Sequence, residues 1–294
     1  MSNLKIGHTG ITWPSDDDYL ATVKTIAAEG FGGIELFAWT LPKIEAQGKL
    51  DIFEEYNIPL WSAYFSHNIL DKSKKAETFE RMKRFAEILV KKGGTHAAFG
   101  GDIIDRRKYN YVDHRDDIIE IVNESGKVLQ DMGVRLCFHP HTGTPIETYN
   151  EITDFFQHID PKYVGFAPDI AQIAKGGSDP MEIMKNFSEL IEHFHFKDYG
   201  GKCEFDRSQV KPLEGETYFN FNDVGKEIDA TGYVNYCVLG DGVVDLLGIL
   251  KFLEEKNFDG HVMVELDGTN AMPISAEESV HRNHLYLQKH GYMA

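Results

Sequence analysis

Short apolar runs alternate with longer amphipathic stretches along almost the whole chain. Most runs end at polar, glycine or proline residues, as expected for buried strands. The runs that we predict to be strands are residues 5–13, 33–38, 59–66, 95–101, 135–139, 163–168, 191–196 and 260–266. The intervening and final stretches predict helices at residues 19–29, 42–56, 73–92, 113–132, 148–158, 180–187, 245–256 and 276–290.

The order of these elements predicts a parallel sheet, because parallel neighbouring strands need a crossover helix between them. Eight such units close into a barrel, so we predict an α/β fold: a (β/α)8 TIM barrel formed as a single domain by residues 1–294. An open doubly wound sheet is the alternative. It is disfavoured because no Gly-x-Gly-x-x-Gly follows the first strand and because polar residues follow nearly every strand.

One connection is much longer than the others. Residues 200–244 separate the seventh predicted strand from its helix and contain the turn Gly240-Asp241-Gly242. A long connection in a compact fold is typical of a functional segment, so this insertion is predicted to be a lid or an oligomer contact. As an oligomer contact it would make the protein a homo-oligomer, a dimer or a tetramer.

Polar residues at the ends of the predicted strands are the candidates for a functional site, because the C-terminal strand ends of such barrels carry the chemistry. They are His8, Glu35, His67, Asp102, His139, His141, Asp169, His195, Lys197 and Glu265. Taken singly, each can equally be a hydrogen-bonded structural residue. Together, two imidazoles and two carboxylates at converging ends suit a divalent metal, and imidazole favours Mn, Co, Zn or Fe over Mg.

Composition limits the partners and the compartment. A formal net charge of -17 argues against a nucleic acid or an anionic membrane as partner, and no apolar run is long enough to span a membrane. The three cysteines, Cys137, Cys203 and Cys237, are widely spaced and odd in number, which indicates free thiols in a reducing compartment. Without a signal-peptide pattern at its start, the chain is predicted to be cytoplasmic.

The aromatic residues near the strand ends suggest a sugar-like ligand. Trp13, Trp39, Trp61, Tyr64 and Phe65 can stack on a sugar ring, although aromatic residues also pack in cores. No glycine-rich loop combines with Lys and Ser or Thr into a phosphate cradle, which favours an unphosphorylated polyol or keto sugar.

The residues that carry this chemistry resemble the xylose isomerase-like barrels, and within them the inosose dehydratase branch. Gly32-Gly33-Ile34-Glu35 resembles the family's second strand, and His139-Pro140-His141-Thr142-Gly143-Thr144 its dehydratases' fifth strand. Gly240-Asp241-Gly242-Val243-Val244-Asp245 is similar to the family's glycine turn before the seventh helix. The resemblance implies that the metal ligands are His139, Asp169, His195 and Glu265.

Two positions depart from the family pattern. The family usually has histidine three residues after the ligand aspartate, where this chain has Gln172, a residue expected to touch substrate but unable to exchange a proton near neutral pH. Many epimerases of the family have glutamate at the position of His139, where it also serves as an acid or base. A metal-bound imidazole is not available for proton transfer, so elimination is favoured over two-base epimerisation.

The remaining candidates are given roles around this metal. His141 is two residues beyond His139 on the same strand face and is predicted to be a base or a substrate contact, or else a hydrogen-bonded supporting residue. Lys197 faces the mouth by the same parity as His195, as a catalytic residue or a salt-bridged one. His67 or Glu35 would protonate a departing hydroxyl, and Glu35 would otherwise tie strands together.

The resulting hypothesis is a divalent-metal-dependent lyase or isomerase that enolises a keto sugar or keto-cyclitol, with Mn or Co as the first choices of metal. Its catalytic residues are His141, Glu265, Lys197 and His67, and its substrate contacts are Glu35, Trp13, Gln172 and Tyr64. Dehydration of an inosose is the first choice of reaction. The alternatives are ketose 3-epimerisation or aldose–ketose isomerisation, cleavage of 3-keto-glycosides by β-elimination, and a metal-free binding subunit.

Overall fold

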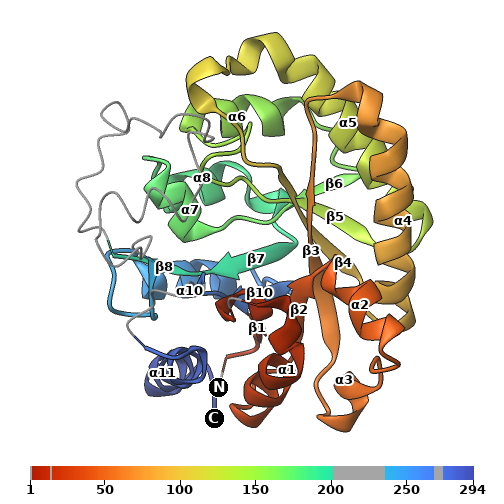
Figure 1. The fold of residues 1–294 in the computed structure, drawn as a ribbon. Coiled ribbons are helices and arrows are strands. Elements are labelled where there is room, and N and C mark those ends of the chain that lie inside the picture. Colours follow the sequence, from red (N-terminus) through yellow and green to blue (C-terminus); the bar gives the residue numbers. More distant parts are fainter. Residues whose placement is uncertain (1, 14, 201–235, 268–273) are drawn as a thin grey trace.

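The computed structural model describes residues 2–13, 15–200, 236–267 and 274–294, and within them eight parallel strands form a barrel wrapped by helices (Figure 1). The barrel strands are β1 Lys5–Thr9, β2 Ile34–Phe37, β3 Leu60–His67, β4 His96–Gly101, β5 Arg135–Phe138, β6 Val164–Phe166, β7 His193–Phe196 and β10 His261–Val264. They are ordered β6-β5-β4-β3-β2-β1-β10-β7. Parallel bridges from Phe166 to Ile191 and from Asp169 to His195 join β6 to β7, which confirms the predicted (β/α)8 fold.

The helices cover the outside of the barrel (Figure 1). They are α1 Tyr19–Ala28, α2 Thr40–Ala46, α3 Ile52–Glu55, α4 Lys75–Lys91, α5 Tyr111–Asp131, α6 Tyr149–His158, α7 Ile170–Lys175, α8 Pro180–Asn186, α10 Leu246–Glu255 and α11 Ala276–Lys289. Short 3-10 helices are η1 Gly10–Thr12, η2 Asp16–Asp18, η3 Lys72–Lys74, η4 Arg106–Lys108 and η5 Ser188–Leu190.

Two differences from the predicted helices have local causes. The helix predicted at residues 42–56 is divided into α2 and α3, because Gly48 lies between them with φ of 66° and ends the first. Helix α7 was not predicted. It is only six residues long and begins directly after β6, where the carboxylate of Asp169 accepts hydrogen bonds from the backbone N–H groups of Ala171 and Gln172.

Side-chain alternation along β7 separates the core from the barrel interior. Phe194 and Phe196 are fully buried and belong to the hydrophobic core. His193 and His195, on the opposite parity, contact Glu35 of β2 inside the barrel. The apolar core therefore lies between the strands and the helices, and polar side chains can gather inside the barrel.

The described part of the predicted insertion at 200–244 folds back on the end of β7. Strand β8, Asp198–Tyr199, pairs antiparallel with β9, Tyr236–Cys237, while residues 201–235 lie outside the described residues. The carboxylate of Asp198 accepts hydrogen bonds from the backbone N–H groups of Gly240, Gly242 and Val244 at 3.0, 2.9 and 3.2 Å. A Cβ at Gly242 would lie 2.2 Å from Asp198 Oδ1, so this turn requires glycine there.

Two further predictions concern the state of the cysteines and the absence of a membrane-spanning segment. Cys137 is a free, buried thiol, and Cys203 lies outside the described residues. Among the helices that the structure describes, none has the length and apolar character needed to cross a membrane.

Candidate functional site

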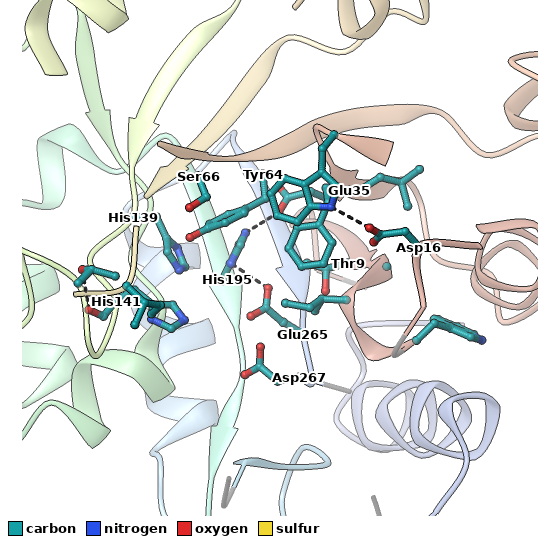
Figure 2. Close-up of a pocket in the computed structure, with 18 of the residues that line it drawn as sticks. Thr9, Asp16, Glu35, Tyr64, Ser66, His139, His141, His195, Glu265 and Asp267 are labelled. Atoms are coloured by element: carbon teal, nitrogen blue, oxygen red, sulfur yellow. Dashed lines mark hydrogen bonds and ion pairs between the residues drawn. The ribbon is translucent and has the colours of Figure 1, made fainter. Parts of the chain in front are cut away.

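A cavity of about 340 Å³ opens at the C-terminal ends of the strands (Figure 2). Eleven residues were predicted to have a catalytic, substrate-binding or metal-binding role. Seven of them line the cavity: Trp13, Glu35, Tyr64, His139, His141, His195 and Glu265. The other four, His67, Asp169, Gln172 and Lys197, are buried beside the cavity without lining it. These positions lie on seven different strands or within a few residues of their ends, so tertiary structure alone brings them together.

The four residues expected to bind metal converge at this end of the barrel. Ligand atoms of His139, Asp169 and His195 all lie within 4.8 Å of one another, and Glu265 Oε2 lies 2.9 Å from His195 Nδ1. Each of these side chains is almost completely buried. Nitrogen and oxygen donors in this combination fit a divalent transition metal.

His139 has the neutral protonation state that a metal ligand needs. Burial, with the positive charge of His195 as the next cause, holds its pKa well below the usual value, so the imidazole is neutral. Its Nδ1 is buried and has no hydrogen-bond partner among the described residues. Burying a nitrogen without a hydrogen-bond partner costs free energy, and coordination of a metal ion by the neutral ring would offset that cost.

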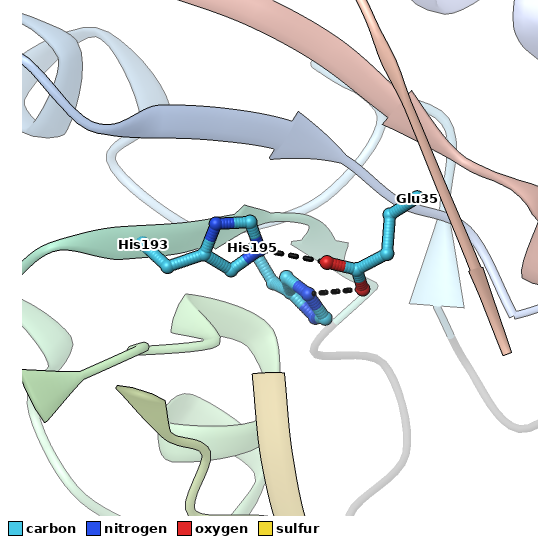
Figure 3. Close-up of side chains that lie close together, drawn as sticks. All are labelled: Glu35, His193 and His195. Carbon is cyan, nitrogen blue, oxygen red and sulfur yellow. Dashed lines mark hydrogen bonds and ion pairs between the residues drawn. The ribbon is translucent and has the colours of Figure 1, made fainter. Parts of the chain in front are cut away.

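Glu35 joins the interior histidines into one hydrogen-bonded group (Figure 3). Its Oε1 lies 2.8 Å from His195 Nε2, while its Oε2 accepts from His193 Nε2 at 2.7 Å and from Ser62 Oγ at 2.6 Å. Burial opposes ionisation of Glu35, but His195 and His193 outweigh it and lower the pKa of the carboxyl. Because Glu35 holds one nitrogen of His195, the other nitrogen is directed toward Glu265, an arrangement typical of histidine ligands.

Lys197 is completely buried and forms ion pairs with three carboxylates. Its Nζ lies 2.6 Å from Glu265 Oε1, 2.8 Å from Asp169 Oδ2 and 2.8 Å from Asp267 Oδ2. Burial alone would lower the pKa of Lys197. The three carboxylates outweigh burial and raise this pKa well above its usual value. Asp267 lines the cavity and was not predicted. It follows Glu265 by two residues, the same spacing that pointed to His141 and Lys197.

Gln172 contacts His141 from behind the cavity wall. Its Oε1 accepts a hydrogen bond from Thr142 Oγ1 at 2.7 Å and lies 3.3 Å from the Thr142 backbone N, which places the Gln172 amide nitrogen toward the imidazole. That nitrogen lies 2.7 Å from His141 Nε2, and His141 Nδ1 lies 2.7 Å from the Thr142 carbonyl oxygen. The pattern defines the tautomer of His141: Nδ1 carries the proton and Nε2 accepts.

His67 faces away from the cavity. Its Nδ1 lies 3.0 Å from Nη2 of Arg81 on α4, and burial together with Arg81 lowers its pKa to about 3. Tyr64 and Ser66, which line the cavity, have the opposite parity on β3. The predicted role of His67 as a proton donor to substrate therefore has no support in its position.

The aromatic residues divide between the cavity and the core. Trp13, Trp39 and Tyr64 line the cavity, and Trp39 stacks on Phe37 with ring centres 4.2 Å apart. Phe65 is fully buried in the hydrophobic core. Trp61 stacks on His261 at the start of β10, at the opposite end of the barrel, with ring centres 4.5 Å apart.

Barrels of parallel strands carry their chemistry at the C-terminal ends of the strands. The buried cluster of histidines and carboxylates lies at this end, so the structure is that of a barrel protein of this class. The chain belongs to the xylose isomerase-like TIM barrel family, whose model matches residues 23–290.

Relatives carry different activities on this fold. An inosose dehydratase of Clostridium perfringens is 24% identical over 299 residues, which cover 95% of this chain and 95% of the relative. The IOLI protein, solved with a binding zinc atom, has a TM-score of 0.73 at 17% identity, covering 97% of both chains. The 3-keto-D-glucoside 4-epimerase YcjR of E. coli has a TM-score of 0.68 at 16% identity, covering 98% of this chain and 100% of that chain.

Replacing Glu35 by glutamine is expected to lower the free energy of unfolding by about 1–3 kcal/mol, because one amide N–H group would face an imidazole N–H where a carboxylate oxygen now accepts. Chemical denaturation of the metal-free protein measures this. Glu29→Gln is the control, since Glu29 is a more exposed carboxylate paired with His281. Equal stability of the two variants would contradict a structural role for the Glu35 group.

Proposed function

We propose that the protein is a divalent-metal-dependent lyase that removes water from a cyclic keto polyol, with an inosose as the first choice of substrate. The observation that carries this proposal is the convergence of His139, Asp169, His195 and Glu265 beside a cavity, with a neutral, unsatisfied imidazole among them. Similarity to an inosose dehydratase over nearly the whole chain supports the choice of substrate. The zinc of the IOLI protein supports a divalent ion, for which Mn and Co remain our first choices.

The metal would be held by His139, Asp169, His195 and Glu265. Bound there, it would act as a Lewis acid toward a substrate ketone and make the neighbouring C–H group acidic. Glu35 keeps the His195 ring in the orientation needed for ligation. Tyr64 and Trp13 provide faces against which a ring can lie.

We assign removal of the α proton to His141. It lines the cavity, and its Nδ1–H points to the Thr142 carbonyl, so Nε2 is the basic nitrogen. Burial lowers the pKa of His141 to about 3, so the imidazole is neutral. In the substrate-free protein Nε2 accepts from Gln172, and that amide would have to move aside before a substrate C–H group could reach Nε2. Once protonated, His141 can return the proton to the departing hydroxyl. The two other predicted donors are not used, since Glu35 is committed to other contacts and His67 lies outside the cavity.

Elimination from a 3-keto-glycoside is the second candidate, and the apolar part of the cavity lining favours it. Five of the residues that line the cavity have large apolar side chains: Ile11, Leu36, Phe37, Trp39 and Ile103. Trp39 and Ile103 are among the large hydrophobic side chains that are exposed. Apolar lining of this kind suits an apolar leaving group attached to the sugar better than it suits a cyclitol that is polar all round.

Metal analysis combined with solvent-deuterium exchange tests these proposals. The purified protein is assayed with and without chelator on inososes, ketohexoses and 3-keto-glycosides. We expect one bound metal ion per chain and metal-dependent exchange at one α carbon. A dehydrated product identifies the first candidate, release of an aglycone the second, and an isomer or epimer of the starting sugar would contradict elimination. Absence of both metal and exchange would leave a metal-free binding protein.

A further inference from the structure

Lys197 occupies the oxygens that a bound metal would need. One oxygen of Asp169, Oδ1, accepts hydrogen bonds from backbone N–H groups at the start of α7 at 2.9 and 3.0 Å, so Oδ2 is the oxygen left for a cation. Lys197 Nζ lies 2.8 Å from that Oδ2. It also lies 2.6 Å from Glu265 Oε1, while Glu265 Oε2 lies near His195. An ammonium and a metal ion at the same two carboxylates repel each other, because both are positive.

A third carboxylate gives Lys197 another place to bind. Asp267 Oδ2 lies 2.8 Å from Lys197 Nζ, and Asp267 lies below Glu265 in the view of Figure 2. Asp169, Glu265 and Asp267, together with Glu35 behind His195, carry four negative charges against the two positive charges of Lys197 and His195. The two negative charges that remain match a divalent ion. With metal on Asp169 and Glu265, the pair of Lys197 and Asp267 is neutral by itself.

We propose that Lys197 is an internal cation that a divalent metal displaces, and that Asp267 is the positioning residue that retains its ammonium when the metal binds. Before metal arrives, Lys197 keeps the buried carboxylates from repelling one another. After metal binding, Asp267 holds the ammonium away from the metal ligands. This inference rests on the metal centre of the proposed function and adds to it a residue pair that sets metal affinity.

The proposal predicts opposite effects for the two partners. Lys197→Met keeps the length of the side chain and removes its charge, so metal affinity is expected to rise about tenfold or more, while the metal-free protein melts at a lower temperature. Asp267→Asn leaves Lys197 with only the metal-ligand carboxylates and is expected to lower affinity about tenfold. In the Lys197→Met background, Asp267→Asn is expected to change affinity less than about twofold, because no ammonium is left to hold.

Calorimetric titration of Mn²⁺ and Zn²⁺ into the chelator-treated full chain measures the four affinities. Asp16→Asn is the matched control for a lost cavity charge, because Asp16 lines the cavity but bonds to Trp39 Nε1. Weaker metal binding by Lys197→Met would overturn the proposal, as would an Asp267→Asn variant that loses no more affinity than Asp16→Asn.

The experiment also separates this inference from the proposed function. A parent protein that binds no metal would overturn both. A parent that binds metal, with the variants unchanged, would overturn the inference alone. If Lys197→Met does not fold, the comparison of Asp267→Asn with Asp16→Asn still decides, because Asp267→Asn keeps the contacts of Lys197 to Asp169 and Glu265.

Discussion

Replacing Asp169 by asparagine is expected to abolish stoichiometric metal binding and to lower turnover at least about a thousandfold, while the chain stays folded. Asparagine keeps an oxygen that can accept the two backbone hydrogen bonds at the start of α7, now made by Asp169 Oδ1. It removes the charge from Oδ2, the oxygen left for a cation. The loss follows from the several kcal/mol that a Lewis acid supplies and from about 1.4 kcal/mol for each tenfold in rate.

Metal analysis, thermal melting and single-substrate kinetics measure this result together. The matched control is Asp179→Asn, because Asp179 caps α8 in the same way, accepting from the backbone N–H groups of Met181 and Glu182, but is exposed and does not line the cavity. Asp179→Asn is expected to keep metal and turnover. An Asp169→Asn variant with metal at the parent stoichiometry would remove Asp169 from the ligand set.

The fold could be predicted from the sequence because each strand is short, apolar and followed by a helix. All eight barrel strands lie within the predicted runs, apart from His67 at the end of β3. Strand ends also limit where chemistry can occur, since parallel strands place all their C-terminal ends at one face of the barrel. The convergence of His139, Asp169 and His195 follows from that geometry.

Contacts between side chains from different elements could not be predicted in the same way. Parity alone could have excluded one expectation: Tyr64 and His67 lie on opposite faces of a regular strand, so both could not face the cavity. The contact of Gln172 with His141 could not be foreseen, because it depends on α7, a helix too short to be recognised. Asp267 was not predicted, although it follows Glu265 by two residues, the same spacing that pointed to His141 and Lys197.

His141→Gln is expected to lower turnover about 10²–10⁴-fold, the range for loss of a general base, while the protein keeps its metal. Glutamine is similar in size and can hydrogen-bond, but it cannot accept a proton near neutral pH. His141 contributes no atom to the cluster formed by His139, Asp169 and His195, so metal content is expected to be unchanged. Deuterium exchange at the substrate α carbon is expected to fall by the same factor as turnover, because both depend on the same proton transfer.

His67→Gln provides the contrast, because it replaces a second buried histidine outside the cavity. This change removes an imidazole next to Arg81 and is expected to lower the melting temperature with little effect on turnover. The two variants therefore separate proton transfer from stability. Turnover that survives in His141→Gln with metal bound would show that another group takes the proton. Loss of turnover in a folded, metal-loaded His67→Gln would instead require His67 to reach the cavity in a conformation other than the one described.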